Sequence, residues 1–137
     1  MNLRRNIFMI FVLVIIISGC VSTKATMTTG QKRPPISPDE VKIYDSIEKV
    51  PGKYEEVALL TSKGDYRHTD YADMYNSMKE EAAKIGANGI ILGNIEDPST
   101  RDLIIDGIFG WPSQIRGKAT AIYVFPTQED EAVTDVK

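Results

Sequence analysis

The chain has 137 residues, with 16 basic and 19 acidic side chains, a formal net charge of −3 and a single cysteine. This length fits one small domain with flexible ends. The acidic balance and the lack of a basic cluster argue against binding to nucleic acid and against electrostatic binding to anionic lipid. A single cysteine also excludes an intrachain disulfide, so the core has to be stable without one.

The beginning of the chain has the pattern of an export signal. Arg4 and Arg5 precede an apolar run from Ile7 to Ile17, after which small and polar residues follow. The run is shorter than the roughly 20 apolar residues of a membrane-spanning helix, so a cleaved signal fits it better. The alternative is an uncleaved helix that anchors the chain in the membrane.

The apolar run ends in Ile17-Ser18-Gly19-Cys20, which resembles the lipobox of bacterial lipoproteins. The resemblance implies that residues 1–19 are removed by cleavage between Gly19 and Cys20, and that the Cys20 thiol then carries lipid at the membrane. Because Val21 rather than aspartate follows the cysteine, resemblance to Gram-negative lipoproteins also implies the outer membrane, on its periplasmic side. A free exported cysteine, open to oxidation, is the other interpretation of Cys20.

The rest of the chain divides into a tether, a domain and a tail. Residues 20–37 contain Ser, Thr, Lys and paired prolines without apolar periodicity, which predicts a flexible tether. We expect the domain at residues 38–125 and a disordered acidic tail at 126–137. Within the domain, Val41 to Tyr44 predicts a short first strand, and the apolar run in Tyr54 to Ser62 predicts a more central one.

The clearest element is a helix from about Tyr71 to Ile85. Its apolar residues recur at steps of three and four, and Asp70 is a suitable N-cap. Gly86 follows the last periodic residue, as expected of a left-handed helix stop. An apolar run starting at Ile90 predicts a buried strand, and residues 118–125 predict the last strand.

The run MKEEAAKIGANGIILGNI, from Met78 to Ile95, resembles small bacterial lipoproteins in which a helix ends in an AAxxGAN motif before an apolar strand. It is similar to the Rcs-stress-sensor lipoprotein family and the YbjQ-like family, most specifically at Ala82–Leu92. Related lipoproteins also have a PxxVxIY strand, matched here at residues 38–44. The resemblance implies an α+β fold with one helix packed on a mostly antiparallel sheet of three to five strands, in the order β-β-α-β-β. The disulfides and partner-binding residues of the stress-sensor family have no counterpart in this chain.

His68 and Asp65, in the polar segment 63–69, are the candidate metal ligands, since an imidazole and nearby carboxylates can bind a transition metal. However, no HxxxH spacing is present, and a solvated loop explains the same residues. No catalytic residue is predicted, because the chain lacks a GxSxG motif and a phosphate-binding glycine loop. We therefore expect a protein that is not an enzyme and that needs no cofactor.

The stretch from Leu103 to Trp111 is apolar but interrupted by glycines. It predicts either an extra strand or flap that closes the core, or an exposed patch that contacts a partner or lipid through Phe109 and Trp111. With the lipobox, the second interpretation predicts a non-enzymatic, lipid-anchored envelope protein that acts as an interaction, sensor or accessory module. The alternatives are a module for a small ligand or metal and a structural surface lipoprotein. The oligomeric state is left open.

Overall fold

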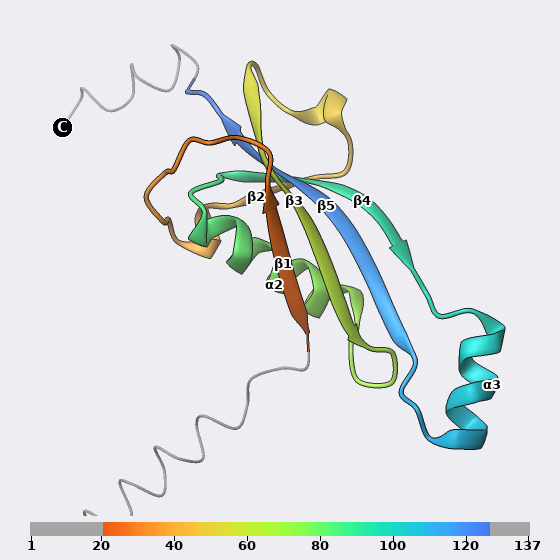
Figure 1. Cartoon of the computed structure of the whole chain (residues 1–137). Helices are drawn as coiled ribbons and strands as arrows, with labels where there is room; N and C mark the ends of the chain where they lie inside the picture. Colours follow the sequence, from red (N-terminus) through yellow and green to blue (C-terminus); the bar gives the residue numbers. More distant parts are fainter. Residues whose placement is uncertain (1–20, 127–137) are drawn as a thin grey trace, which may run out of the picture.

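The computed structural model describes residues 21–126 and contains a five-stranded sheet with one helix against a face and a second helix at one end (Figure 1). The strands are β1 (Ser22–Met27), β2 (Lys42–Tyr44), β3 (Tyr54–Asp65), β4 (Gly89–Glu96) and β5 (Gln114–Val124). The helices are α2 (Tyr71–Lys84) and α3 (Thr100–Phe109), and the short 3-10 turns are η2 (Pro38–Glu40) and η3 (Ile47–Lys49).

The sheet has the strand order β1-β3-β5-β4-β2, and its strands pair antiparallel except for β2 with β4. This confirms the predicted α+β class, with a helix packed on a mostly antiparallel sheet. The predicted order β-β-α-β-β corresponds to β2, β3, α2, β4 and β5. The structure adds β1 before this series and α3 between its last two strands.

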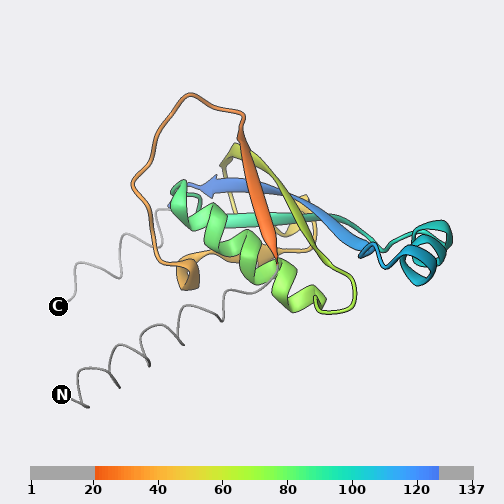
Figure 2. The ribbon, with the colours of Figure 1, turned by 60° about the horizontal axis from the view of Figure 1, so that its bottom comes forward.

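Helix α2 lies across one face of the sheet and supplies its side of the core (Figure 2). Met78 and Ala82 are fully buried in one apolar cluster with Leu60 of β3 and Ala119 of β5. Met74 is also fully buried, and its sulfur accepts a hydrogen bond from the Ser62 hydroxyl of β3. The apolar period predicted for this helix therefore corresponds to a buried face, worth about 25 cal/mol for each Å² of apolar surface removed from water.

The start and stop of α2 are those the sequence predicts. The Asp70 carboxylate accepts a hydrogen bond from the Asp73 amide at 2.8 Å, and the Asp73 carboxylate accepts one from the Asp70 amide at 3.1 Å. This reciprocal capping satisfies two N–H groups that the first helical turn leaves unpaired. Gly86 follows the helix with a φ of 72°, in the left-handed region that glycine adopts without steric cost.

The prediction of a flexible tether at residues 20–37 is wrong for the described part of that segment. Ser22–Met27 form β1, which pairs with β3 from Ser22 opposite Lys63 to Met27 opposite Ala58. The inward residues of this strand are small: Thr23 bonds to Ser77 of α2 at 2.7 Å, and Ala25 packs on the core. Because these side chains are only weakly apolar, their alternation leaves no hydropathy signal.

After β1 the chain crosses the C-terminal end of α2 as a second ordered segment. The Arg33 guanidinium pairs with the Glu55 carboxylate at 2.6 Å and lies 4.5 Å from the Tyr123 ring centroid. The Ile36 amide donates to the carbonyl of Ala83 at 3.0 Å. These contacts hold residues 33–36 against the domain, which again differs from a tether.

The Gly86-Ala87-Asn88 motif joins this crossing segment to the sheet. A Cβ on Gly86 would come within 2.5 Å of the Arg33 Cβ and 2.6 Å of the Pro34 carbonyl oxygen. The Asn88 amide pairs with the backbone of Val124, donating at 2.9 Å and accepting at 2.7 Å. The motif therefore has a structural role in this fold, as a helix stop and a link to β5.

Candidate functional site

Helix α3 is the feature of the fold that the packing of the core does not explain. The Ser99 hydroxyl accepts a hydrogen bond from the Asp102 amide, and the Asp102 carboxylate accepts one from the Ser99 amide at 3.1 Å, so the helix begins with the same reciprocal cap as α2. It ends at Gly110, which has a φ of 70° and donates its N–H to the Asp106 carbonyl at 2.8 Å. These local signals, Ser99-x-x-Asp102 and Gly110, were present in the sequence.

The expectation of an extra strand or flap over the core at Leu103–Trp111 is therefore wrong, because residues 100–109 form a helix that projects from the end of the sheet (Figures 1 and 2). Its one buried residue is Asp106, which is 5% exposed. The other interpretation of this stretch, an exposed apolar patch, agrees with the exposure of its side chains.

Asp106 attaches α3 to the rest of the domain. Its carboxylate forms an ion pair with Arg67 in the loop between β3 and α2, and accepts a hydrogen bond from the Ser113 amide at 3.4 Å. The Ser113 carbonyl in turn accepts from the Tyr66 amide at 3.0 Å. A buried carboxylate needs such partners, so this polar contact fixes the position of the helix in place of an apolar interface.

The outward side of α3 is apolar. The exposed fractions are 41% for Leu103, 57% for Ile104, 69% for Ile108, 66% for Phe109 and 69% for Trp111, and we call these five residues the α3 apolar surface. At 3.6 residues per turn, Leu103, Ile104 and Ile108 lie on one side of the helix. The rings of Phe109 and Trp111 are 5.9 Å apart, so the structure brings these two predicted contact residues together.

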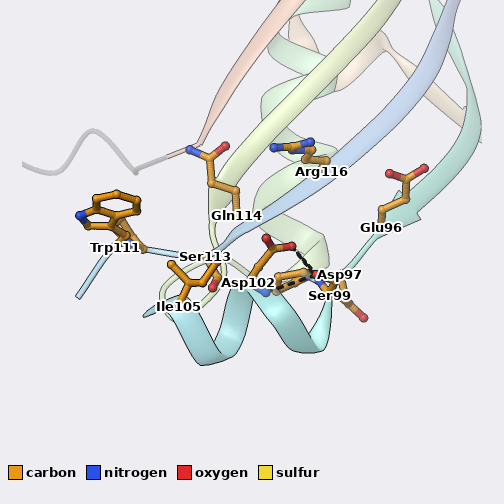
Figure 3. A pocket seen from close by; sticks show the side chains of 11 residues that line it. Glu96, Asp97, Ser99, Asp102, Ile105, Trp111, Ser113, Gln114 and Arg116 are labelled. Carbon is orange, nitrogen blue, oxygen red and sulfur yellow. Dashed lines mark hydrogen bonds between the residues drawn. The ribbon is translucent and has the colours of Figure 1, made fainter. Parts of the chain in front are cut away.

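A hollow of about 460 Å³ lies between α3 and the adjoining ends of β4 and β5 (Figure 3). Glu96, Asp97, Asp102 and Arg116 line it, with Trp111 at one side. Hydrogen bonds from Ser99 lower the pKa of the Asp102 carboxyl. In the figure, Asp102 and Ser99 lie together, while Arg116 stands apart from them on β5.

The two candidate metal ligands do lie together. His68 Nδ1 is 3.4 Å from the Asp65 carboxylate, and the His68 side chain is well exposed. Among residues 21–126, no group of three or more His, Cys, Asp or Glu side chains is arranged to hold a metal ion. Nearby, the charge of Asp97 raises the pKa of the exposed Tyr71 hydroxyl, which donates to the Asp97 carboxylate at 3.3 Å.

Gly19 and Cys20, the residues of the predicted cleavage and lipid attachment, lie outside the described residues. The predicted tail at 126–137 also falls outside them, apart from Pro126. Within the described part of the chain, no helix combines the length and the apolar character needed to cross a bilayer.

No model of a known protein family matches the chain, and no curated protein matches it significantly. A solved structure does match: the chain is similar to the crystal structure of a Francisella virulence factor, FvfA, with a TM-score of 0.52 and 14% sequence identity. The match covers 74% of this chain and 96% of that one. At this level of identity the likeness shows a shared fold.

Proposed function

We propose that this chain is a lipid-anchored protein of the bacterial cell envelope that is not an enzyme, and that its domain is an interaction module that binds through the α3 apolar surface. The observation that carries the proposal is the exposure of Ile104 and Ile108 on a helix held away from the sheet, and of Trp111 just after the end of that helix. Contiguous exposed apolar side chains are uncommon on proteins that act alone, and they mark contact surfaces.

The position of α3 supports a contact role. The helix is attached to the domain through one polar residue, Asp106. Leu103, Ile104 and Ile108 stay exposed, so they contribute little to the stability of the fold. A tryptophan beside a phenylalanine at the end of the helix is the kind of aromatic anchor that dominates binding energy at contact surfaces. The apolar surface is therefore available to a partner without a cost to the core.

The lipid anchor is supported by the first twenty residues of the sequence. Ile17-Ser18-Gly19-Cys20 resembles a lipobox, and an apolar run with a basic segment before it precedes the motif. The similarity of Ala82–Leu92 to the Rcs-stress-sensor lipoprotein and YbjQ-like families points to the same compartment. A sensor or accessory role at the outer membrane fits both features.

Two measurements test the proposal. Mass spectrometry of the protein extracted from membranes should find an acylated N-terminal peptide that begins at Cys20, and Cys20→Ala should abolish it. A photo-crosslinking residue at position 108 should then capture an envelope component, lipid or protein, in intact cells. The matched control is position 47, also an isoleucine, with half of its surface exposed. It belongs to η3, which lies at the other end of the sheet from α3 (Figure 1). An unacylated N-terminus, or equal capture at both positions, would contradict the proposal.

A further inference from the structure

We infer that the α3 apolar surface binds the lipid bilayer itself, so that α3 lies in the membrane interface beside the lipid on Cys20. This inference rests on the proposed lipidation of Cys20, and it names the partner of the same surface. It follows from where β1 begins, from the short chain between β1 and Cys20, and from the chemistry of the outward side of α3.

The sheet register places the start of β1 at the end of the sheet from which α3 projects. Ser22 pairs with Lys63 of β3, Lys63 pairs with Arg116 of β5, and Arg116 pairs with Glu96 of β4. These four residues form one row across the sheet, about 14 Å wide at a strand spacing of roughly 4.8 Å. Helix α3 adjoins the Glu96 side of this row, since it connects the end of β4 to the start of β5 (Figure 1).

The chain between the lipid and the domain is short. Cys20 precedes Ser22 by two residues, which span at most about 7 Å when fully extended. A flexible tether of residues 20–37 would have let the domain stand clear of the head groups. Because Ser22–Met27 are instead part of the sheet, lipid on Cys20 holds the row of Ser22, Arg116 and Glu96, and with it α3, close to the bilayer surface.

The outward side of α3 has the chemistry of an interfacial helix. Its ten residues span about 15 Å, too short to cross the hydrocarbon but enough to lie in the interface. Leu103, Ile104 and Ile108 form an apolar stripe, with the exposed Arg101 one turn before Ile104. Asp102 and Asp106 face the opposite side, in the hollow and in the ion pair with Arg67. Tryptophan is enriched at the level of the lipid head groups, where Trp111 would then lie.

The charges nearby indicate what kind of lipid contact this is. The hollow behind α3 is lined by Glu96, Asp97 and Asp102, with Arg116 as its one cation. Arg101 on α3 and Lys63 in the row add two further positive charges, so acidic and basic side chains nearly balance here and the attraction to anionic lipid is weak. We therefore expect binding that depends on apolar burial, that occurs on zwitterionic bilayers, and that is insensitive to salt. A soluble protein partner is less favoured, because it would have to enter the narrow space beside the head groups.

Trp111 provides the test, because it is the single tryptophan of the chain and is 69% exposed. The full lipidated protein is reconstituted in phosphatidylcholine vesicles, with or without acyl chains brominated near their middle. We expect the brominated chains to lower Trp111 emission roughly twofold or more, because interfacial helices sit about 5–10 Å into the head-group boundary. Aqueous iodide should quench it weakly, at low and at high salt.

Paired variants separate the α3 surface from general exposure of apolar side chains. Ile104→Ser with Ile108→Ser should restore most of the emission and should let iodide reach Trp111. Ile47→Ser with Leu59→Ser changes two side chains that are 50% and 51% exposed elsewhere, and should leave quenching by bromine unchanged. Far-UV circular dichroism of each variant verifies the fold.

Mass spectrometry of the same sample distinguishes failure of the inference from failure of the proposed function. Protein without acyl groups on Cys20 counts against the anchor, and therefore against both. Acylated, vesicle-bound protein whose Trp111 is open to iodide and unaffected by bromine overturns the inference alone. Crosslinks from position 108 to a protein, and none to lipid, would likewise overturn it while the interaction module stands.

Discussion

The two helices of this domain begin and end in the same way but contribute differently to it. Both start with reciprocal side-chain caps, Asp70 with Asp73 and Ser99 with Asp102, and both are followed by a glycine with φ near 70°. Helix α2 buries its apolar residues against the sheet. Helix α3 buries an aspartate and exposes its apolar residues. Caps and stops therefore define where a helix lies in the sequence, whereas its surroundings decide what it does.

The two helices therefore have different roles: α2 contributes to the stability of the fold, and α3 provides a surface for binding. A ten-residue helix is marginal alone in water, so α3 depends on its caps and on the Asp106–Arg67 pair. Its apolar side chains could have stabilised the fold if they had packed inward. Their exposure instead keeps them available for binding, and we regard α2 with the sheet as the scaffold and α3 as the contact element.

The largest effect should come from truncating a matched pair of apolar residues, one on each helix. Met78→Ala removes a fully buried side chain from the core and should lower the free energy of unfolding by about 2–5 kcal/mol. Ile108→Ala removes a side chain that is 69% exposed and should change it by no more than about 0.5 kcal/mol. Urea denaturation followed by far-UV circular dichroism measures both.

A destabilisation by Ile108→Ala comparable to that by Met78→Ala would show that α3 is part of the core after all. The comparison would then fail, and the α3 apolar surface would lose its interpretation as a contact site. A normal unfolding transition for Ile108→Ala, together with altered quenching of Trp111 in vesicles, would support the separate roles of the two helices.

The two helix-stop glycines give the next largest contrast. Alanine at either position costs about 1–2 kcal/mol locally, because an L-residue is strained in the left-handed region. At Gly86 the new Cβ also meets the Pro34 carbonyl oxygen at 2.6 Å, and overpacking of this kind adds about 1–3 kcal/mol. At Gly110 nothing lies within 4 Å of the added Cβ. Because α3 can fray without unfolding the sheet, Gly110→Ala should barely change global stability.

Urea unfolding of Gly86→Ala and Gly110→Ala tests this contrast, and hydrogen exchange locates the change. Faster exchange confined to residues 100–109 is expected for Gly110→Ala. Equal global losses for the two variants would contradict the separation of scaffold and contact element.

The sequence predicted the parts of the fold that are specified locally. For α2, the apolar period, the Asp70 cap and the Gly86 stop all agree with the structure, as does the strand that follows. It did not reveal β1, whose inward residues Thr23 and Ala25 are too weakly apolar to give a signal. The contact of Arg33 and Pro34 with Gly86 joins segments some fifty residues apart, which no local pattern can show.

The candidate site was predicted in part. The apolar composition of residues 103–111 predicts a contact through Phe109 and Trp111, and the structure places these two side chains together at the exposed end of α3. Glycines at 107 and 110 hide the helix in the sequence, because glycine usually interrupts a helix, yet Gly107 lies inside α3 with open space around its Cα. Asp106 could not be recognised as an anchor, because its partner Arg67 comes from a distant loop.

The smallest expected effect concerns the α3 cap and its dependence on pH. Hydrogen bonds from the Ser99 side chain and amide lower the pKa of Asp102 in the folded protein. A carboxyl with a lowered folded-state pKa stabilises the fold above its unfolded value, about 3.9, and this contribution is lost as the pH falls through the folded value. The start of α3 should therefore loosen below about pH 4, while the core remains folded.

NMR titration of the Asp102 carboxyl and the Ser99 amide measures this. Ser99→Ala removes the stronger hydrogen bond, so it should raise the Asp102 pKa toward its ordinary value; an identical titration in both proteins would mean that the cap does not hold the exposed helix in place.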